Sequence, residues 1–207
     1  MIKKQIILVG GGGHAKACLD VIESDSTWHV KGYLDVKQTL SDSYGLDFLG
    51  SDLEASKFVH EAQFLITIGQ LGHSPIREKL FSELKKINAE FAIVKANNAI
   101  ISKKSIIGKG TIVMHGAILQ TDTSVGENCI VNDRVLIEHD STIGNHCHIS
   151  TGAIINGGVR IGNGVFIGSG SVLKNGITIG NNCVIGMGAI VTKSIGHGLT
   201  VFGNPAK

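Results

Sequence analysis

Residues 143–168 read IGNHCHISTGAIINGGVRIGNGVFIG, and an aliphatic side chain returns at every sixth position. The same period runs from Ile101 to Val191, where all sixteen of its positions are aliphatic. The residue two places before each of them is mostly small or β-branched. A period of six with two inward positions fits neither an amphipathic helix nor a flat strand. It predicts a parallel β-helix in which three hexads make one triangular coil of eighteen residues.

Glycines spaced eighteen residues apart support this prediction. Each follows a core aliphatic residue, and the series comprises Gly108, Gly126, Gly144, Gly162 and Gly180. We expect them at equivalent corners of successive coils, where the turn needs either a positive φ or a close approach of two backbones. About five coils fit between residue 101 and Val191. A β-sandwich of short strands would instead show a period of two with turns every 8–12 residues, which the sequence lacks.

The cysteines fit the same scheme. Cys129, Cys147 and Cys183 fall on one small inward position of the repeat, so we interpret them as core residues. The chain has no CxxC pair, which argues against a disulfide or thiolate metal framework. His146 and His148 lack a partner at ligand spacing, so no metal is expected.

Composition limits the function classes. The 207 residues are 43% hydrophobic and 5% aromatic, which excludes a disordered chain, and the net charge of +2 leaves no basic surplus for nucleic acid or an anionic membrane. No apolar run is long enough to span a membrane, and the N-terminus does not look like a signal peptide, so we expect a cytoplasmic protein. Nine glycines precede residue 100 and nineteen follow it. This contrast indicates two domains, 1–98 and 99–207.

The first domain reads as a Rossmann-like βαβαβ unit. A buried strand over 4–9 runs into Gly10–Lys16 (GGGGHAK), and a helix follows over 15–23. A glycine loop at a helix N-terminus suits a phosphate. A strand over 29–34 ends at Asp35, where a dinucleotide fold places its ribose-binding acid.

A third strand is predicted over 63–68, followed by Gly69, a helix over 75–86 with Arg77 near its start, and a last strand with a polar link over 87–100. The unit is too short for a full NAD domain. The alternative for the loop is that it only turns the chain.

The GGGGHAK loop, the hexads and the terminal GNPAK of residues 203–207 together resemble the bacterial sugar O-/N-acetyltransferase family. That family includes sialic-acid O-acetyltransferases and N-acetyltransferases of UDP-linked 4-amino sugars. The resemblance implies a left-handed β-helix, a homotrimer, and acetyl-CoA bound in the groove between neighbouring β-helices. It also implies a nucleotide-linked amino sugar as the acceptor.

The resemblance implies a catalytic base in the segment 137–140, IEHD. His139 suits that role because histidine titrates near neutrality, and Asp140, with Glu138 as the alternative, would orient its ring. Gly157 lies eighteen residues later on the same corner, about 4.8 Å away by strand spacing, and its amide would donate to the thioester oxygen. The resemblance implies that the sugar nucleotide contacts Gly11, Gly12, Gly13, His14, Asp35, Gly69 and Asn132. It implies that acetyl-CoA contacts His148, Gly157, Ser169, Met187, Gly203 and Pro205.

The leading hypothesis is an enzyme that transfers acetyl from acetyl-CoA to the 4-amine of a nucleotide-activated sugar by direct attack, since no cysteine or serine sits in a nucleophile setting. A sialic-acid-type O-acetyltransferase is the first alternative. A γ-carbonic-anhydrase-like metalloenzyme and a non-catalytic nucleotide-sugar binder are more distant ones. His115 is expected on a different corner from His139, as a surface or trimer contact. The remaining histidines are interpreted as surface residues: His29, His60, His73 and His197.

Overall fold

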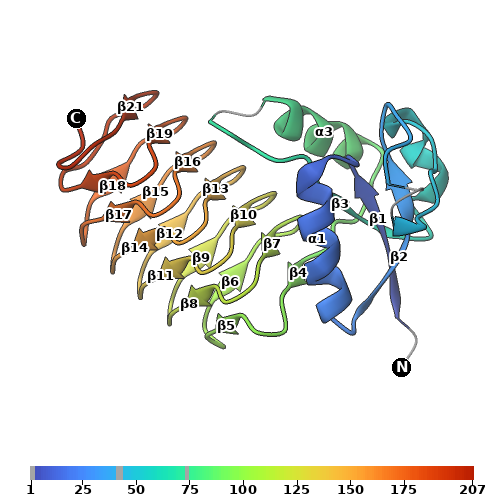
Figure 1. Ribbon diagram of the computed structural model, residues 1–207, viewed down its shortest axis with the longest axis horizontal. Coiled ribbons are helices and arrows are strands. Elements are labelled where there is room, and N and C mark those ends of the chain that lie inside the picture. The colour runs from blue at the N-terminus through green and yellow to red at the C-terminus, as the bar shows by residue number, and fades with distance from the viewer. Residues whose placement is uncertain (1–2, 41–43, 73–74) are drawn as a thin grey trace.

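A computed structural model describes residues 3–40, 44–72 and 75–207. An N-terminal α/β unit packs against one end of a long β-helix, and the C-terminus lies at the far end (Figure 1). The Rossmann-like unit and the parallel β-helix predicted from the sequence are both confirmed. His73 lies outside the described residues. Of the helices that the structure describes, none has the length and apolarity needed to cross a membrane.

The N-terminal unit is a parallel sheet in the order β2-β1-β3, with helices on both faces. Its strands are β1 (Lys4–Val9), β2 (Trp28–Leu34) and β3 (Gln63–Ile66), and its helices are α1 (Gly13–Ser24), the 3₁₀ helix η1 (Asp52–Phe58) and α3 (Pro75–Lys86). In β1, Ile6 and Leu8 pack with α1, while Ile7 and Val9 pack with α3. Burial on both faces explains why β1 is an uninterrupted apolar run.

The strand expected within residues 87–100 is divided between the two parts of the molecule. Phe91 forms a parallel bridge with Phe64 of β3, in which Phe64 N–H donates to the Glu90 carbonyl at 2.8 Å and Ala92 N–H donates to the Phe64 carbonyl at 3.0 Å. A little further on, β4 (Val94–Lys95) pairs in parallel with β7 of the β-helix. The last pairing of the N-terminal sheet is therefore one bridge at Phe91, and the β-helix begins before residue 101.

The β-helix has three faces, with two-residue strands stacked in register every eighteen residues, except in the last coil, where β19 and β21 are sixteen residues apart. The N-terminal unit packs on the covered face, which consists of β4 (Val94–Lys95), β7 (Ile112–Val113), β10 (Ile130–Val131), β13 (His148–Ile149), β16 (Phe166–Ile167), β19 (Val184–Ile185) and β21 (Thr200–Val201). The aliphatic face consists of β5 (Ile100–Ile101), β8 (Ile118–Leu119), β11 (Leu136–Ile137), β14 (Ile154–Ile155), β17 (Val172–Leu173) and β20 (Ile190–Val191). The polar face consists of β6 (Ile106–Ile107), β9 (Ser124–Val125), β12 (Thr142–Ile143), β15 (Arg160–Ile161) and β18 (Thr178–Ile179). With strands in stacks of seven, six and five, the β-helix is longer than the five coils expected.

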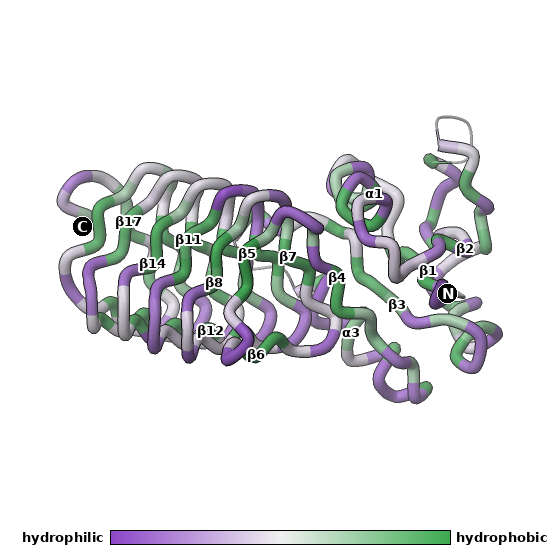
Figure 2. The backbone as a smooth tube through the Cα atoms, turned by 90° about the horizontal axis from the view of Figure 1, so that it is seen from below, coloured by the Kyte–Doolittle hydropathy of each residue, from purple (hydrophilic) through white to green (hydrophobic). Residues whose placement is uncertain are grey.

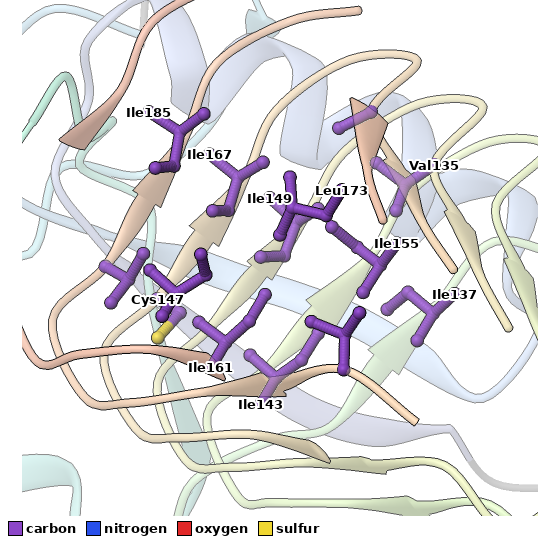
Figure 3. Close-up of a cluster of buried hydrophobic side chains, with 14 of the residues drawn as sticks. Val135, Ile137, Ile143, Cys147, Ile149, Ile155, Ile161, Ile167, Leu173 and Ile185 are labelled. Carbon is purple, nitrogen blue, oxygen red and sulfur yellow. The ribbon is translucent and has the colours of Figure 1, made fainter. Parts of the chain in front are cut away.

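From β5 to β21 the second residue of each strand points inward, and these aliphatic side chains fill the interior (Figure 3). The three cysteines are buried and free, as interpreted from the sequence. They also make a bond that the spacing did not reveal. The Sγ–H of Cys129 donates to the Gly144 carbonyl at 3.1 Å, and the Sγ–H of Cys147 donates to the Gly162 carbonyl at 3.0 Å. A small inward donor thus satisfies a backbone carbonyl at the turn fifteen residues further on.

The glycines of the eighteen-residue series serve close approach. A Cβ added to Gly144 would lie 2.7 Å from backbone atoms of Gly162 one coil on. Positive φ occurs at a different place, two residues later, where Gly164 has φ 66°. Each corner has an equivalent position with positive φ, and some of these positions hold residues with a side chain, such as Asn128 (φ 54°) and Asp140 (φ 60°). Asn and Asp tolerate the left-handed region better than other residues with a side chain.

Three corners join the faces. The first corner (residues 132–135 and their equivalents) joins the covered and aliphatic faces. The second corner (138–141) joins the aliphatic and polar faces, and the third corner (144–147) joins the polar and covered faces. Outward residues of the aliphatic face are all Ile, Leu or Val, and they form a stripe along the axis (Figure 2).

Candidate active site

The second corner brings His139, Asp140 and Gly157 together. His139 is exposed, and its Nδ1 lies 2.7 Å from Asp140 Oδ2. A Cβ added to Gly157 would lie 2.7 Å from His139 Nε2, so the ring lies directly over the glycine. Glycine at 157 leaves the space that this ring position requires.

The Asp140 carboxylate determines the protonation pattern of the His139 ring. A carboxylate can only accept, so Nδ1 carries the proton and Nε2 of the neutral ring keeps a free lone pair. The hydrogen bond to Asp140 raises the pKa of His139 above its usual value, and the charges of Asp140 and Glu138 act in the same direction. The raised pKa makes Nε2 of this ring a stronger base than that of an unperturbed histidine.

The backbone around Gly157 is held by its neighbours. Gly158 N–H donates to the His139 carbonyl at 2.9 Å, and the Gly157 carbonyl accepts from Gly176 N–H at 3.0 Å. Within the described ranges, the Gly157 N–H donates to no protein acceptor. A free amide beside the imidazole has the chemistry of an oxyanion donor.

A second group of polar side chains lies where the N-terminal unit meets the covered face. His148 is buried, and its Nδ1 donates to the Gln70 carbonyl at 2.7 Å. Its Nε2 lies 3.2 Å from Asn132 Nδ2, so it accepts from that amide. His14 follows the glycine loop and lies beside Gly69, whose added Cβ would be 3.4 Å from the Cβ of His14. His14, Gly69, Asn132 and His148 are thus gathered in one place.

Both histidines, the buried His148 and the half-buried His14, are held neutral. Burial, with the charge of Arg77 adding to it, lowers the pKa of His14 to about 4. Burial also lowers the pKa of His148 to about 4, although its bond to the Gln70 carbonyl opposes the shift. Nε2 of His14 is buried and has no hydrogen-bond partner among the described residues. It is a polar atom available to a ligand.

The glycine loop presents free amides at the start of α1. Gly11 N–H donates to Asp35 Oδ2 at 2.6 Å, which fixes the loop. Gly12 and Gly13 are exposed, and in the part of the chain that the structure describes their amides and that of His14 donate to no protein acceptor. A cavity of about 350 Å³ opens nearby at the carboxyl ends of β1 and β2. Its lining includes Val9, Leu34, Asp35, Ile68, Ile76 and Leu80.

The residues expected to contact acetyl-CoA follow the first corner along the β-helix. Ser169 is exposed and shares a 2.8 Å hydrogen bond with Ser150, while Met187 is exposed two coils beyond His148. Gly203 and Pro205 are exposed at the C-terminal end. His115 lies on this same corner, bonded to Asn98 at 3.1 Å, and so on a different corner from His139 as expected. His29, His60 and His197 are exposed.

The residues described here include no group of three His, Cys, Asp or Glu side chains that could hold a metal ion. Nor do the hydrogen bonds of the described residues connect the second corner to the group around His148. The expected site residues therefore form two half-sites on different corners of one chain.

Both parts of the chain match known protein families. Residues 5–84 match the PglD N-terminal domain, and residues 122–157 and 158–193 match the bacterial transferase hexapeptide (six repeats). The chain joins a PglD N-terminal domain to bacterial transferase hexapeptide repeats. This finding confirms the resemblance to the sugar acetyltransferases.

Two solved structures resemble the chain over its whole length. The acetyltransferase domain of PglB from Neisseria gonorrhoeae FA1090 in complex with acetyl coenzyme A is 27% identical, with a TM-score of 0.92 over 99% of this chain and 98% of that one. PerB from Caulobacter crescentus in complex with CoA and GDP-perosamine is 25% identical, with a TM-score of 0.90 over 98% and 96%.

A curated relative resembles part of the chain. It is the UDP-N-acetylbacillosamine N-acetyltransferase of Bacillus subtilis (strain 168), which is 31% identical over 114 residues. The match covers 54% of this chain and about half of the relative, 51% of its length.

Sequence reasoning missed the role of Gln70 in the PglD N-terminal domain. Gln70 is buried, and it holds His148 through its backbone carbonyl. A backbone contact leaves no trace in side-chain chemistry. The available signal was its place directly after Gly69, because the carboxyl ends of parallel strands gather at one edge of a sheet.

Proposed function

We propose that the protein is an acetyl-CoA-dependent N-acetyltransferase acting on the amino group of a nucleotide-activated amino sugar, with the 4-amine as the expected position. The observation that carries the proposal is the full-length likeness to sugar acetyltransferase structures, one in complex with acetyl-CoA and another with CoA and a GDP-linked sugar. The His139–Asp140 pair over Gly157 supplies matching chemistry.

In the proposed reaction, the sugar nitrogen attacks the thioester carbonyl carbon. His139 Nε2 takes the proton that the amine loses, and Asp140 stabilises the charged ring. The negative charge that develops on the carbonyl oxygen is stabilised by the Gly157 amide. The carbon–sulfur bond then breaks, and the proton passes from His139 to the departing sulfur, which gives free CoA and the acetamido sugar.

The PglD N-terminal domain would hold the sugar nucleotide. The amides of Gly12, Gly13 and His14 lie at the N-terminus of α1, where the helix dipole favours the diphosphate. The cavity beside Asp35 has the size and apolar lining for a base and its ribose. His14, Gly69, Asn132 and His148 then lie toward the sugar.

A trimer would complete the site. The aliphatic face lies between the first and second corners, and a partly exposed aliphatic stripe of this kind favours association. Packing this face against the next copy around a threefold axis brings His139 of one copy toward the Asn132–His148 corner of its neighbour. The first-corner residues Ser169, Met187, Gly203 and Pro205 would then line the groove that holds acetyl-CoA.

The activity is tested with purified protein, acetyl-CoA and a panel of UDP-, GDP- and dTDP-linked 4-amino sugars. Release of CoA thiol together with a product heavier by one acetyl group supports the proposal. Turnover of free sialic acid, with none of the nucleotide sugars accepted, would overturn it in favour of an O-acetyltransferase. Binding of a nucleotide sugar without turnover would identify a binding protein instead.

The shared site is tested by mixing two inactive variants. His139→Ala and His148→Asn each remove one half-site, and co-expression gives trimers in which about a quarter of the interfaces combine two intact halves. We expect about that fraction of wild-type activity to return. Activity that stays absent in mixed trimers would show that each site is built within a single chain.

A further inference from the structure

Arg77 is a buried cation to which the proposed chemistry assigns no role. It lies in the first turn of α3, and its side chain is only 1% exposed. Burial lowers its pKa to about 10, so the guanidinium stays charged at neutral pH. Removing a charge from water is costly unless it is well bonded, so its partners matter.

The guanidinium bonds to both parts of the molecule. Nη1 donates to the carbonyls of Ile66 and Ile68, at 2.8 and 2.6 Å, where β3 ends. Nη2 donates to Asn128 Oδ1 at 2.8 Å and to the Asn128 carbonyl at 3.3 Å, on the third corner of the β-helix. All four acceptors are uncharged. A single planar cation therefore ties the end of β3 to a coil of the β-helix.

The segment that Arg77 holds leads directly to the contacts of His14 and His148. Ile68 is followed by Gly69, which lies against His14, and by Gln70, whose carbonyl fixes the His148 ring. The side-chain Nε2 of Gln70 also donates to the His146 carbonyl at 3.4 Å. A shift at the end of β3 would therefore move the contacts of His14 and His148 together.

Asn128 is held in a way that suits this bond. It has φ 54°, a conformation that favours glycine, and glycine does occupy the equivalent positions 110 and 164 of the same corner. Its Nδ2 lies 2.9 Å from His146 Nδ1, which orients the side chain. At this coil the left-handed position carries an acceptor for Arg77.

We propose that Arg77 is a positioning residue for acetyl transfer, because its guanidinium fixes the end of β3 on the β-helix and so sets the glycine loop and Gln70 relative to His148. This inference rests on the proposed function. Arg77 is buried, and it does not line the cavity beside Asp35. It therefore acts through the main chain of residues 66–70, to which its guanidinium is bonded. Losing it should leave each ligand bound and impair the step that needs both.

The test compares Arg77→Met with the wild-type trimer. We expect the dissociation constants of CoA and of the nucleoside diphosphate alone to change less than about threefold, and kcat with the sugar nucleotide to fall about 100-fold, the scale of a misplacement near 1 Å. Nitrogen NMR of the His148 ring should change from a single Nδ1–H tautomer to a mixture. Arg77→Lys should recover only part of kcat relative to Arg77→Met, because the lysine ammonium group restores the charge but reaches fewer of the four acceptors than the guanidinium does.

Two further variants keep the test decisive. Lys86→Met removes an exposed cation from the same helix and should leave every readout unchanged. Asn128→Gly keeps the backbone conformation and removes the Oδ1 acceptor of Arg77 together with the Nδ2 contact to His146. It should lower kcat about tenfold even if Arg77→Met fails to fold. Wild-type kcat and an unchanged His148 tautomer in Arg77→Met or Asn128→Gly would overturn the inference. A wild-type protein that transfers no acetyl group would overturn the proposed function instead, and the NMR and binding readouts would still judge Arg77.

Discussion

Two histidines nine residues apart in the chain occupy opposite environments. His139 is exposed, has a carboxylate at Nδ1, and has a raised pKa. His148 is buried, has a backbone carbonyl at Nδ1, and has a pKa lowered to about 4. Both neutral rings carry the proton on Nδ1. The opposite shifts of their pKa values therefore come from the charge of the Nδ1 partner and from burial. One ring can accept a proton from a substrate, while the other is fixed as a neutral hydrogen-bond acceptor.

The largest effect is expected from His139→Ala, which removes the proposed base. We expect kcat to fall about 1,000-fold, within the range of general-base catalysis, with little change in stability because the ring is exposed. Steady-state release of CoA thiol measures the loss. His60→Ala removes another exposed histidine and should have wild-type activity. A His139→Ala protein with full activity would contradict the role given to this ring.

The second expected effect concerns the free energy of unfolding, to which the neutral His148 and His14 contribute. Because the folded pKa of His148 is about 4 and an unfolded histidine titrates near 6.5, the stabilisation is complete above pH 6.5 and is lost as the pH falls toward 4. The change is roughly 3 kcal/mol for one such group, and His14 shifts in the same direction. Urea unfolding at pH 7.5, 5.5 and 4.5 measures the loss. We expect the free energy of unfolding to fall less with pH in His148→Asn than in the wild type. Equal losses in the two proteins would contradict the role given to His148.

A smaller effect is expected from Gly157→Ala. The added methyl group would lie 2.7 Å from His139 Nε2 and must displace the ring. We expect kcat to fall about 30-fold while the binding of CoA persists. Gly196→Ala is the matched change, because its Cβ would meet nothing nearer than 3.6 Å, and it should retain activity. Equal kinetics in the two variants would show that the place of the ring over Gly157 is unimportant.

The smallest effect is expected from Asp140→Asn, which keeps a residue that tolerates φ 60° but removes the charge. Because Asp140 raises the pKa of His139, its loss lowers that pKa and moves the acidic limb of the kcat profile to lower pH. We also expect kcat at neutral pH to fall about tenfold. Asp122→Asn changes the equivalent residue one coil earlier, with φ 58°, and should leave the profile in place. An acidic limb that stays fixed in Asp140→Asn would contradict the assignment.

Local pattern was enough to predict much of the fold. The run Lys4–Val9 is β1 and the helix Pro75–Lys86 is α3, because an apolar run and an amphipathic segment are properties of the residues themselves. The hexads predicted the core, since each inward position repeats. The spacing of eighteen also placed Gly157 beside His139.

Contacts between the two parts could not be predicted in the same way. Ile93 and Val94 are apolar and β-branched, which suits either sheet, and only packing assigns Val94–Lys95 to the β-helix. The bond between Arg77 and Asn128 joins residues 51 positions apart. The partner of His148 is a backbone carbonyl, which every residue possesses. Such contacts depend on how the finished parts dock, and no periodicity encodes them.

The constant rise of the coils also makes the β-helix a ruler. From the coil of Asn132 to that of Gly203 the chain climbs four coils, about 19 Å at the spacing of neighbouring strands. Along the eighteen-residue coils the span changes only in whole coils if the core is to stay covered, and only the last coil, from β19 to β21, is shorter, at sixteen residues. Removal of residues 158–175 would preserve every inward position yet shorten the ruler by one step. The reach between the two ends of an extended cofactor would thus be set by counting coils, independently of the side chains that touch it.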